Sequence, residues 1–317
     1  MWKRVLRTVP FGQFFNMVNK MSMRFPGHKA HILPLNHVPT ITSEEKEKLK
    51  CILGYKKSHI AFTPEEEFFG LQALRELGVP DKKSFVCFHA RDAAYLNVMY
   101  PKMSWSYHDY RDSSISHYIP SIEELARRGY SAIRMGAIVR EKLAVNNPEI
   151  IDYACNGNRT DFLDIYLGAK CEFFICSDTG ISIIPEVFRR PAVYTNWTPI
   201  KRISPWVLNG LFIFKKFYFQ TGKRLLTFRE IINSPLGEFG STDMFIQGGI
   251  ELIENTPEEI TAVAIEMDER LKGTWQTTKE DEELQERFWV LFGPGQLKSP
   301  DVRIGAEFLR QNQELLN

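Results

Sequence analysis

The stretch from Phe173 to Pro191 reads FFICSDTGISIIPEVFRRP. Four apolar residues end abruptly at Ser177-Asp178-Thr179-Gly180, and an amphipathic segment follows before Pro191 opens a second apolar run. This order of buried strand, tight loop, helix and strand predicts a βαβ unit of a parallel sheet. Such a loop leaves backbone N–H groups at the positive end of a helix dipole, which is a seat for an anion. The alternative is an ordinary capped turn, which every α/β protein needs.

A second buried strand is predicted at Phe85-Val86-Cys87-Phe88, and His89-Ala90-Arg91-Asp92 follows it directly. Open α/β sheets bind ligands at the carboxyl ends of their strands. The planar donors of Arg91 suit bidentate contact with a phosphate. The alternative is a surface Arg–Asp pair, which contributes little to stability. We therefore predict that Arg91 and the loop 177–180 converge on a pyrophosphate group.

Strand and helix patterns alternate along residues 85–195 and predict about five strands with intervening helices. We expect a Rossmann-like parallel sheet with helices on both faces, since parallel neighbours are joined by right-handed crossovers. The organisation predicted from this pattern is a basic, aromatic segment (1–60), a Rossmann-like domain (61–275) and a helical extension (276–317). Helices are expected at 64–77, 161–170 and 257–271, and a terminal helix at 300–315.

Residues 93–120 show no clear element but are dense in aromatic and charged side chains. Trp105, Tyr107 and His108 stand close to Arg111 and Asp112. Long irregular loops in compact domains are usually functional or disordered, and this aromatic content argues against disorder. The rings could stack on a base or a sugar. The alternative is a packed cover over the edge of the sheet.

Composition restricts the class of protein and its partners. The chain has 317 residues and a formal net charge of +1, so it lacks the basic field typical of nucleic-acid binders. No apolar run approaches the ~20 residues of a membrane span. Residues 1–43 carry six basic and no acidic side chains, interleaved with apolar ones. Residues 1–25 could therefore lie on an anionic membrane surface, and the alternatives are that the segment packs on the main domain or is a reduced form of a larger N-terminal domain. The five cysteines show no CxxC spacing and predict a reduced cytoplasmic protein, peripheral on the inner membrane face if residues 1–25 bind lipid.

Four segments together resemble a known family. FVCFHARD (85–92), HDYRDSSISHYIPSIEELARRGYSAIRMG (108–136), FFICSDTG (173–180) and PAVYTNW (191–197) are similar to a group of bacterial glycosyltransferases. That group is related to the fucosyltransferase-like enzymes of the two-lobed GT-B architecture. The resemblance covers roughly residues 60–275 and implies a GT-B donor lobe that holds a GDP- or UDP-linked sugar. Few residues precede the first strand, so the acceptor lobe is expected to be shortened, supplied by another chain, or absent.

The resemblance also assigns roles to residues. It implies that Arg91 contacts the donor diphosphate and that the backbone of Ser177, Asp178, Thr179 and Gly180 holds its β-phosphate. Glu186 stands where related enzymes bind the ribose. Further candidate donor contacts are Arg111, Asp112 and Arg134.

Under this hypothesis the enzyme transfers a sugar from a nucleotide sugar to a glycan or lipid-linked acceptor, in cell-surface polysaccharide synthesis. The departing diphosphate gathers negative charge, which Arg91 and the loop amides could stabilise without a metal. No metal-ligand cluster and no DxD motif stands in the sequence. The candidate bases for an inverting reaction are Asp92, Asp112, His89 and His108, of which Asp92 is preferred.

Two other functions stay open. A non-hydrolysing sugar-nucleotide epimerase would use a related two-lobed scaffold. A non-catalytic subunit would bind a nucleotide sugar or scaffold a polysaccharide assembly, and the short N-terminal region favours it. A dinucleotide oxidoreductase is disfavoured, since no GxGxxG follows an early strand.

Overall fold

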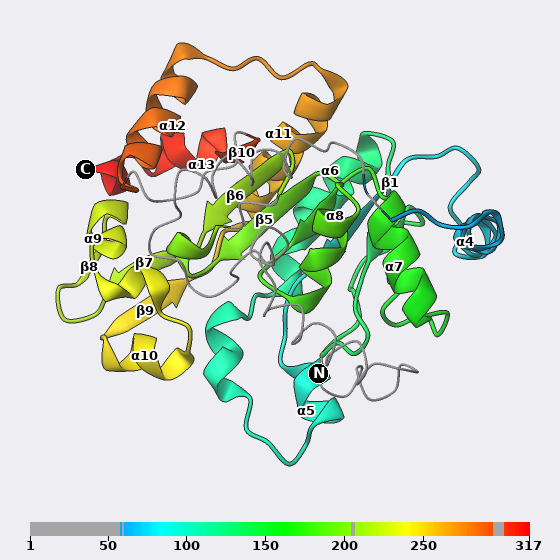
Figure 1. Cartoon of the computed structure of the whole chain (residues 1–317), viewed down its shortest axis with the longest axis horizontal. Helices are drawn as coiled ribbons and strands as arrows, with labels where there is room; N and C mark the ends of the chain where they lie inside the picture. Colours follow the sequence, from blue (N-terminus) through cyan, green and yellow to red (C-terminus); the bar gives the residue numbers. More distant parts are fainter. Residues whose placement is uncertain (1–57, 59, 204–206, 294–300) are drawn as a thin grey trace, which may run out of the picture. The chain divides into compact units, whose positions relative to one another are not determined.

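The centre of the fold is a seven-stranded sheet in the order β10-β6-β5-β4-β1-β2-β3 (Figure 1). The computed structural model describes residues 58, 60–203, 207–293 and 301–317. Every neighbouring pair of strands in this sheet runs parallel. The strands are β1 (Phe85–His89), β2 (Ser131–Arg134), β3 (Ile150–Ile151), β4 (Phe174–Cys176), β5 (Ala192–Trp197), β6 (Gly210–Phe214) and β10 (Val302–Ile304). The strand order reverses between β1 and β4, as in Rossmann folds. The predicted Rossmann-like parallel sheet is confirmed.

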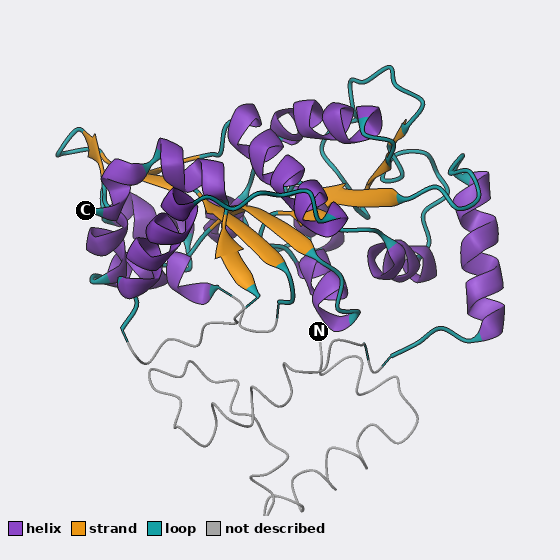
Figure 2. Cartoon of the chain, turned by 90° about the horizontal axis from the view of Figure 1, so that it is seen from above, coloured by secondary structure: helices purple, strands orange, loops and turns teal. Residues whose placement is uncertain are grey.

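Helices cover both faces of this sheet (Figure 2). Helix α7 packs with α8, and α6 packs with α11. The α-helices are α4 (Pro64–Glu76), α5 (Ala94–Met99), α6 (Ile119–Arg127), α7 (Asp161–Lys170), α8 (Ile183–Val187), α9 (Phe228–Ile232), α10 (Thr242–Gln247), α11 (Pro257–Lys272), α12 (Lys279–Val290) and α13 (Ala306–Gln311). Single 3-10 turns are η2 (Ser106–Arg111), η3 (Ile115–Tyr118), η4 (Gly180–Ser182), η5 (Ile200–Arg202), η6 (Pro235–Glu238) and η7 (Gln313–Leu316).

The helices predicted with most certainty are those with strong local end signals. Thr63 caps α4 in a reciprocal capping box with Glu66, and Thr256 does the same for α11. Helix α11 ends at Gly273, whose φ of 70° is the left-handed conformation that glycine adopts without strain. Because these interactions lie within a few residues of sequence, the pattern locates both helices closely.

A smaller antiparallel sheet lies beyond β6. Its order is β8-β7-β9, formed by β7 (Lys216–Phe219), β8 (Arg224–Leu225) and β9 (Ile250–Ile253). It is joined to the central sheet by two buried asparagines. The backbone N–H of Asn196 donates to Oδ1 of Asn255 (2.5 Å), and the N–H of Asn255 donates to Oδ1 of Asn196 (2.7 Å). This reciprocal pair fixes the end of β5 against the segment between β9 and α11.

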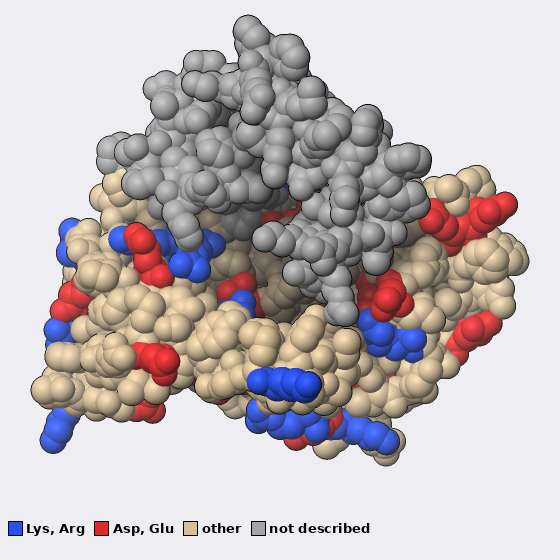
Figure 3. All heavy atoms as spheres, turned by 60° about the horizontal axis from the view of Figure 1, so that its bottom comes forward, with Lys and Arg blue, Asp and Glu red and all other residues tan. Residues whose placement is uncertain are grey.

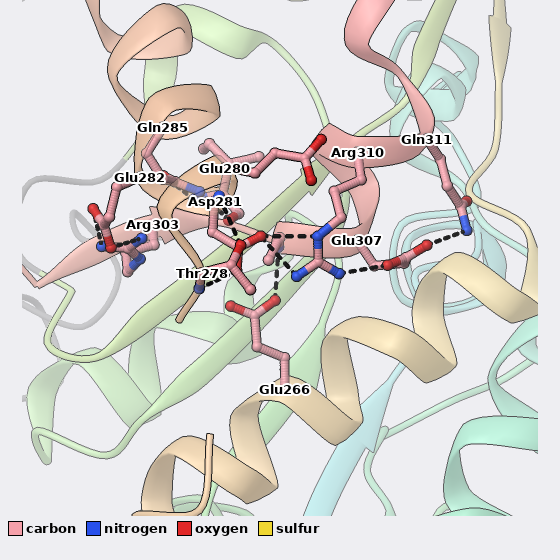
Figure 4. A network of polar contacts seen from close by, with 12 residues as sticks. Glu266, Thr278, Glu280, Asp281, Glu282, Gln285, Arg303, Glu307, Arg310 and Gln311 are labelled. Carbon is pink, nitrogen blue, oxygen red and sulfur yellow. Dashed lines mark hydrogen bonds and ion pairs between the residues drawn. The ribbon is translucent and has the colours of Figure 1, made fainter. Parts of the chain in front are cut away.

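The C-terminal residues complete the central sheet rather than forming a purely helical extension. The predicted helix at 300–315 is instead the strand β10 followed by α13 and η7. Figure 4 shows the polar network that holds them. Asp281 accepts hydrogen bonds from the N–H of Thr278 (2.9 Å) and from Nε of Arg310 (2.9 Å), and Glu266 accepts from the N–H of Ala306 (2.7 Å). These carboxylates therefore tie α11, α12 and α13 together.

Three local predictions are corrected. Residues 93–120 are not irregular throughout but contain α5, η2 and η3. The helix expected after Gly180 is one 3-10 turn and the short α8. The polar residues 195–199 suggest a loop after the apolar run 192–194, but the first three of them are the end of β5, where Thr195 and Asn196 are buried. Oγ1 of Thr195 pairs with the hydroxyl of Tyr118 (2.6 Å), and Oδ1 of Asn196 accepts from the N–H of Asn255 (2.7 Å).

The predicted membrane-surface segment, residues 1–25, lies outside the described residues, as does Cys51. Cys87 and Cys176 are fully buried, as their strands predicted. None of the helices in the described part of the chain combines the length and apolar character needed to cross a membrane.

Candidate functional site

The two segments singled out in the sequence meet at the point where the strand order reverses. Strands β1 and β4 are parallel neighbours, with His89 beside Cys176 in the register. The chain leaves both strands at the same edge, and the backbone N–H of Arg91 donates to Oγ of Ser177 (3.0 Å). Ligands of open α/β sheets bind in the crevice at this reversal. The backbone of Arg91 therefore meets the loop 177–180 at the predicted edge, and a pyrophosphate bound between them stays a prediction.

Arg91 places a buried positive charge at this edge. Its residue is 6% exposed, and Nη1 pairs with Oδ1 of Asp112. The second terminal nitrogen, Nη2, is buried and has no hydrogen-bond partner among the described residues. Burial, and then the charge of Arg111, lower the pKa of Arg91 to about 10, so the guanidinium stays charged at neutral pH. A buried cation with an unpaired donor can accept an anion as a further partner.

Arg111 joins the aromatic-rich loop to the loop after β4. Its Nη1 lies 3.5 Å from Oδ2 of Asp178, and its guanidinium lies over the ring of Tyr110. Burial raises the pKa of Asp178, and the charge of Arg111 opposes this rise. Oγ1 of Thr179 is buried without a described partner, and a Cβ placed on Gly180 would meet nothing within 4 Å. Space is therefore open in front of this loop.

Two charged residues of this cluster were missed in the sequence. Lys215 is the residue after β6, and its Nζ donates to the backbone oxygen of Asp112 (2.5 Å). Burial lowers the pKa of Lys215 to about 8, while Glu254 opposes this. Glu254 follows β9 and accepts from the N–H of Ser114 (2.9 Å). A lysine directly after the apolar run 211–214 places a cation at the carboxyl end of that strand, but its burial depends on segments distant in the sequence.

The candidate bases His89 and Asp92 are engaged in holding the backbone. Nδ1 of His89 lies 2.9 Å from the carbonyl oxygen of Met135, and burial lowers the pKa of this histidine. Oδ1 of Asp92 accepts from the N–H of Ala94 (2.8 Å), and Oδ2 accepts from the N–H of Arg140 (3.0 Å). Both oxygens of the preferred base thus have partners within the chain.

Arg134 and Glu186 also make contacts away from the Arg91 guanidinium. Arg134 is 1% exposed, donates to the carbonyl oxygen of Glu141 (2.7 Å) and lies 3.5 Å from a carboxylate oxygen of Asp152. It therefore holds the loop after β2. Glu186, on α8, accepts from the hydroxyl of Tyr194 (3.1 Å).

His108 is the candidate base with an available ring nitrogen. Its Nδ1 is buried and has no partner among the described residues. Burial, followed by the charges of Arg111 and Arg91, lowers the pKa of His108 to about 4, so the imidazole is neutral at pH 7. Its ring is parallel to that of Trp105, with ring centroids 6.3 Å apart, and is tilted by 41° against that of Tyr107, with centroids 3.9 Å apart. Burial and the nearby arginines disfavour the protonated imidazole, so His108 could serve as a base only where an anion offsets their charge.

Charge on the face drawn in Figure 3 is mixed. Lys and Arg side chains alternate with Asp and Glu over its described surface. Across residues 58, 60–203, 207–293 and 301–317, no three His, Cys, Asp or Glu side chains gather closely enough to hold a metal ion.

Comparison of the chain with protein-family models, with curated proteins and with solved structures finds no significant match.

Proposed function

We propose that the protein binds a nucleotide sugar in the crevice between β1 and β4, as a GT-B donor lobe does, and transfers the sugar to a glycan or lipid-linked acceptor. The observation that carries this proposal is the contact of Arg91 with Ser177 at the strand-order reversal. The same residue carries a buried guanidinium, which pairs with Asp112 and whose Nη2 has no partner among the described residues. The acceptor class and a role in polysaccharide synthesis rest on the family resemblance alone.

Glycosyl transfer requires stabilisation of a leaving diphosphate. Negative charge develops on that group as the bond to the sugar breaks, and fixed donors aimed at it lower the barrier. Arg91 has five N–H donors, and Asp112 pairs with one of its two terminal nitrogens. Arg111, held 3.5 Å from Asp178, is the second arginine at this edge. Both charges can be shared with phosphate oxygens without a metal.

The reaction also requires a base if it inverts the sugar. The acceptor hydroxyl must lose its proton, and a neutral imidazole or a carboxylate can take it. Both oxygens of Asp92 accept backbone hydrogen bonds, whereas Nδ1 of His108 has no described partner. We therefore assign the base to His108 in place of Asp92.

A non-catalytic binding subunit is the second candidate. The engagement of Asp92 and His89 with backbone groups favours it. Both functions need the same binding site, so binding and turnover have to be measured separately.

The test is a thermal-shift panel of GDP, UDP and their sugars on the full chain. A ligand at a hundredfold excess over its Kd stabilises the protein by about 2.7 kcal/mol. We expect one base to do this, and Arg91→Met to lose most of the shift. The matched control is Arg190→Met. The side chain of Arg190 donates to the carbonyl oxygen of Cys171 (2.6 Å). Arg190 is therefore an arginine with a structural contact, but it lies at the amino ends of β4 and β5, away from the proposed site.

No shift with any nucleotide, or an equal loss in both variants, would refute the site. Hydrolysis of the bound nucleotide sugar then separates the two candidates. A transferase releases sugar slowly to water and loses this activity in His108→Gln, whereas a binding subunit shows no turnover.

A further inference from the structure

Lys215 is a buried cation without a carboxylate partner. Its residue is 4% exposed and follows β6 at the carboxyl edge of the sheet. Among the described residues, no carboxylate oxygen lies within 4 Å of its Nζ, and its hydrogen bond goes to the neutral carbonyl of Asp112. Buried charges in proteins are ordinarily paired. An ammonium held in this way has donors left for an anion.

The charged groups around Lys215 connect it to the proposed site. Asp112 pairs through its carboxylate with Arg91 and through its carbonyl oxygen with Lys215. The charge of Arg91 lowers the pKa of Lys215 and that of Glu254 raises it. Glu254 in turn lies 3.4 Å from Nδ1 of His117. Arg91 and Lys215 thus flank one residue, at the ends of β1 and β6.

We propose that Lys215 is a second cationic contact for the diphosphate, which it binds together with Arg91. This inference rests on the proposed function and adds a residue from a third strand end to the site. A diphosphate carries oxygens on two phosphorus atoms and can meet two cations at once. The anion would supply a counter-charge at hydrogen-bond distance from Lys215, which no carboxylate of the described residues does.

The titration of Lys215 gives a signature of this contact. Its pKa is about 8, so at pH 8.5 about a quarter of the amines carry a proton. The terminal phosphate of GDP or UDP is fully ionised at this pH, because its second proton leaves near pH ~6. A bound anion raises the pKa of Lys215, and the complex therefore takes up part of a proton from the buffer.

The experiment is titration calorimetry of the full chain with GDP and UDP at pH 8.5, in two buffers of different ionisation enthalpy. For the wild type, we expect proton uptake of about 0.5 or more per site. Lys215→Met should lose about tenfold or more in affinity and should lose the uptake. The matched control is Lys216→Met, since Nζ of Lys216 pairs with Glu259 (2.6 Å) instead. This control should bind within about twofold of the wild type and keep the uptake.

Unchanged affinity in Lys215→Met, or binding by the wild type without proton uptake, would overturn the contact and leave the Arg91 site standing. The wild-type measurement decides the point even if a variant fails to fold. Failure of the wild type to bind either nucleotide would overturn the proposed function itself.

Discussion

Replacing Lys215 by methionine is expected to stabilise the protein at neutral pH. The pKa of Lys215 falls from its ordinary 10.5 to about 8, mainly through burial. At 1.36 kcal/mol for each pH unit, this difference corresponds to about 3 kcal/mol of destabilisation when the amine is charged. Methionine removes the charge but leaves the carbonyl oxygen of Asp112 unpaired, at a cost of about 1–2 kcal/mol. The expected net gain is about 1–2 kcal/mol.

The gain should depend on pH in a defined direction. The folded protein binds the proton of Lys215 more weakly than the unfolded chain does, so wild-type stability rises with pH between about 8 and 10.5. Below pH 8 both states are protonated and the full penalty is present. The advantage of Lys215→Met should therefore be complete at pH 7 and should be largely lost by pH 10.

The assay is urea unfolding of the wild type, Lys215→Met and Lys216→Met at pH 7 and pH 10. Lys216→Met should be less stable than the wild type, because it leaves the buried Glu259 without its ion pair. The reasoning is refuted if Lys215→Met loses as much stability at pH 7 as Lys216→Met does. Residues that are needed for function often destabilise the protein when the ligand is absent, and Lys215 would be such a residue.

Two further predictions concern other charged groups. Asp281→Ala should cost about 1–3 kcal/mol at pH 7, because the N–H of Thr278 loses its acceptor and Arg310 keeps only Glu307 as a partner; urea unfolding checks this. Burial raises the pKa of Asp281, but its hydrogen bonds to Thr278 and Arg310 outweigh burial, so the net pKa is lowered. The ionised carboxylate therefore stabilises the fold above its ordinary pKa, and the destabilisation caused by Asp281→Ala should shrink as the pH falls below about 4. His108 should titrate near pH 4 by NMR and move upward in Arg111→Met, and a titration near 6.5 in both proteins would contradict the described surroundings.

The part of the site that could be predicted from the sequence consists of residues that come directly after buried strands. Residues directly after two buried parallel strands must leave the sheet at the same edge, so the meeting of Arg91 and Ser177 was readable from sequence. Helix α7 was likewise predicted with its observed bounds, because Thr160 caps it locally.

The rest depends on contacts between distant segments. Helix α5 has no side-chain cap at Ala93, so no local signal marked its start. Lys215 stands between two apolar runs and resembles an ordinary strand-edge lysine until the burial imposed by other segments is known. The partner of Asn196 lies 59 residues further along the chain. Sequence spacing carries no information about such a pair.

The paired asparagines have a consequence for motion. The side-chain oxygen of each asparagine accepts the backbone N–H of the other, as a carbonyl oxygen of a neighbouring strand would. The junction of the two sheets is therefore hydrogen-bonded like a pair of residues within a sheet. The small sheet should therefore not hinge against the large one. The amides of Asn196 and Asn255 should be among the last in the chain to exchange with deuterium, opening only with global unfolding.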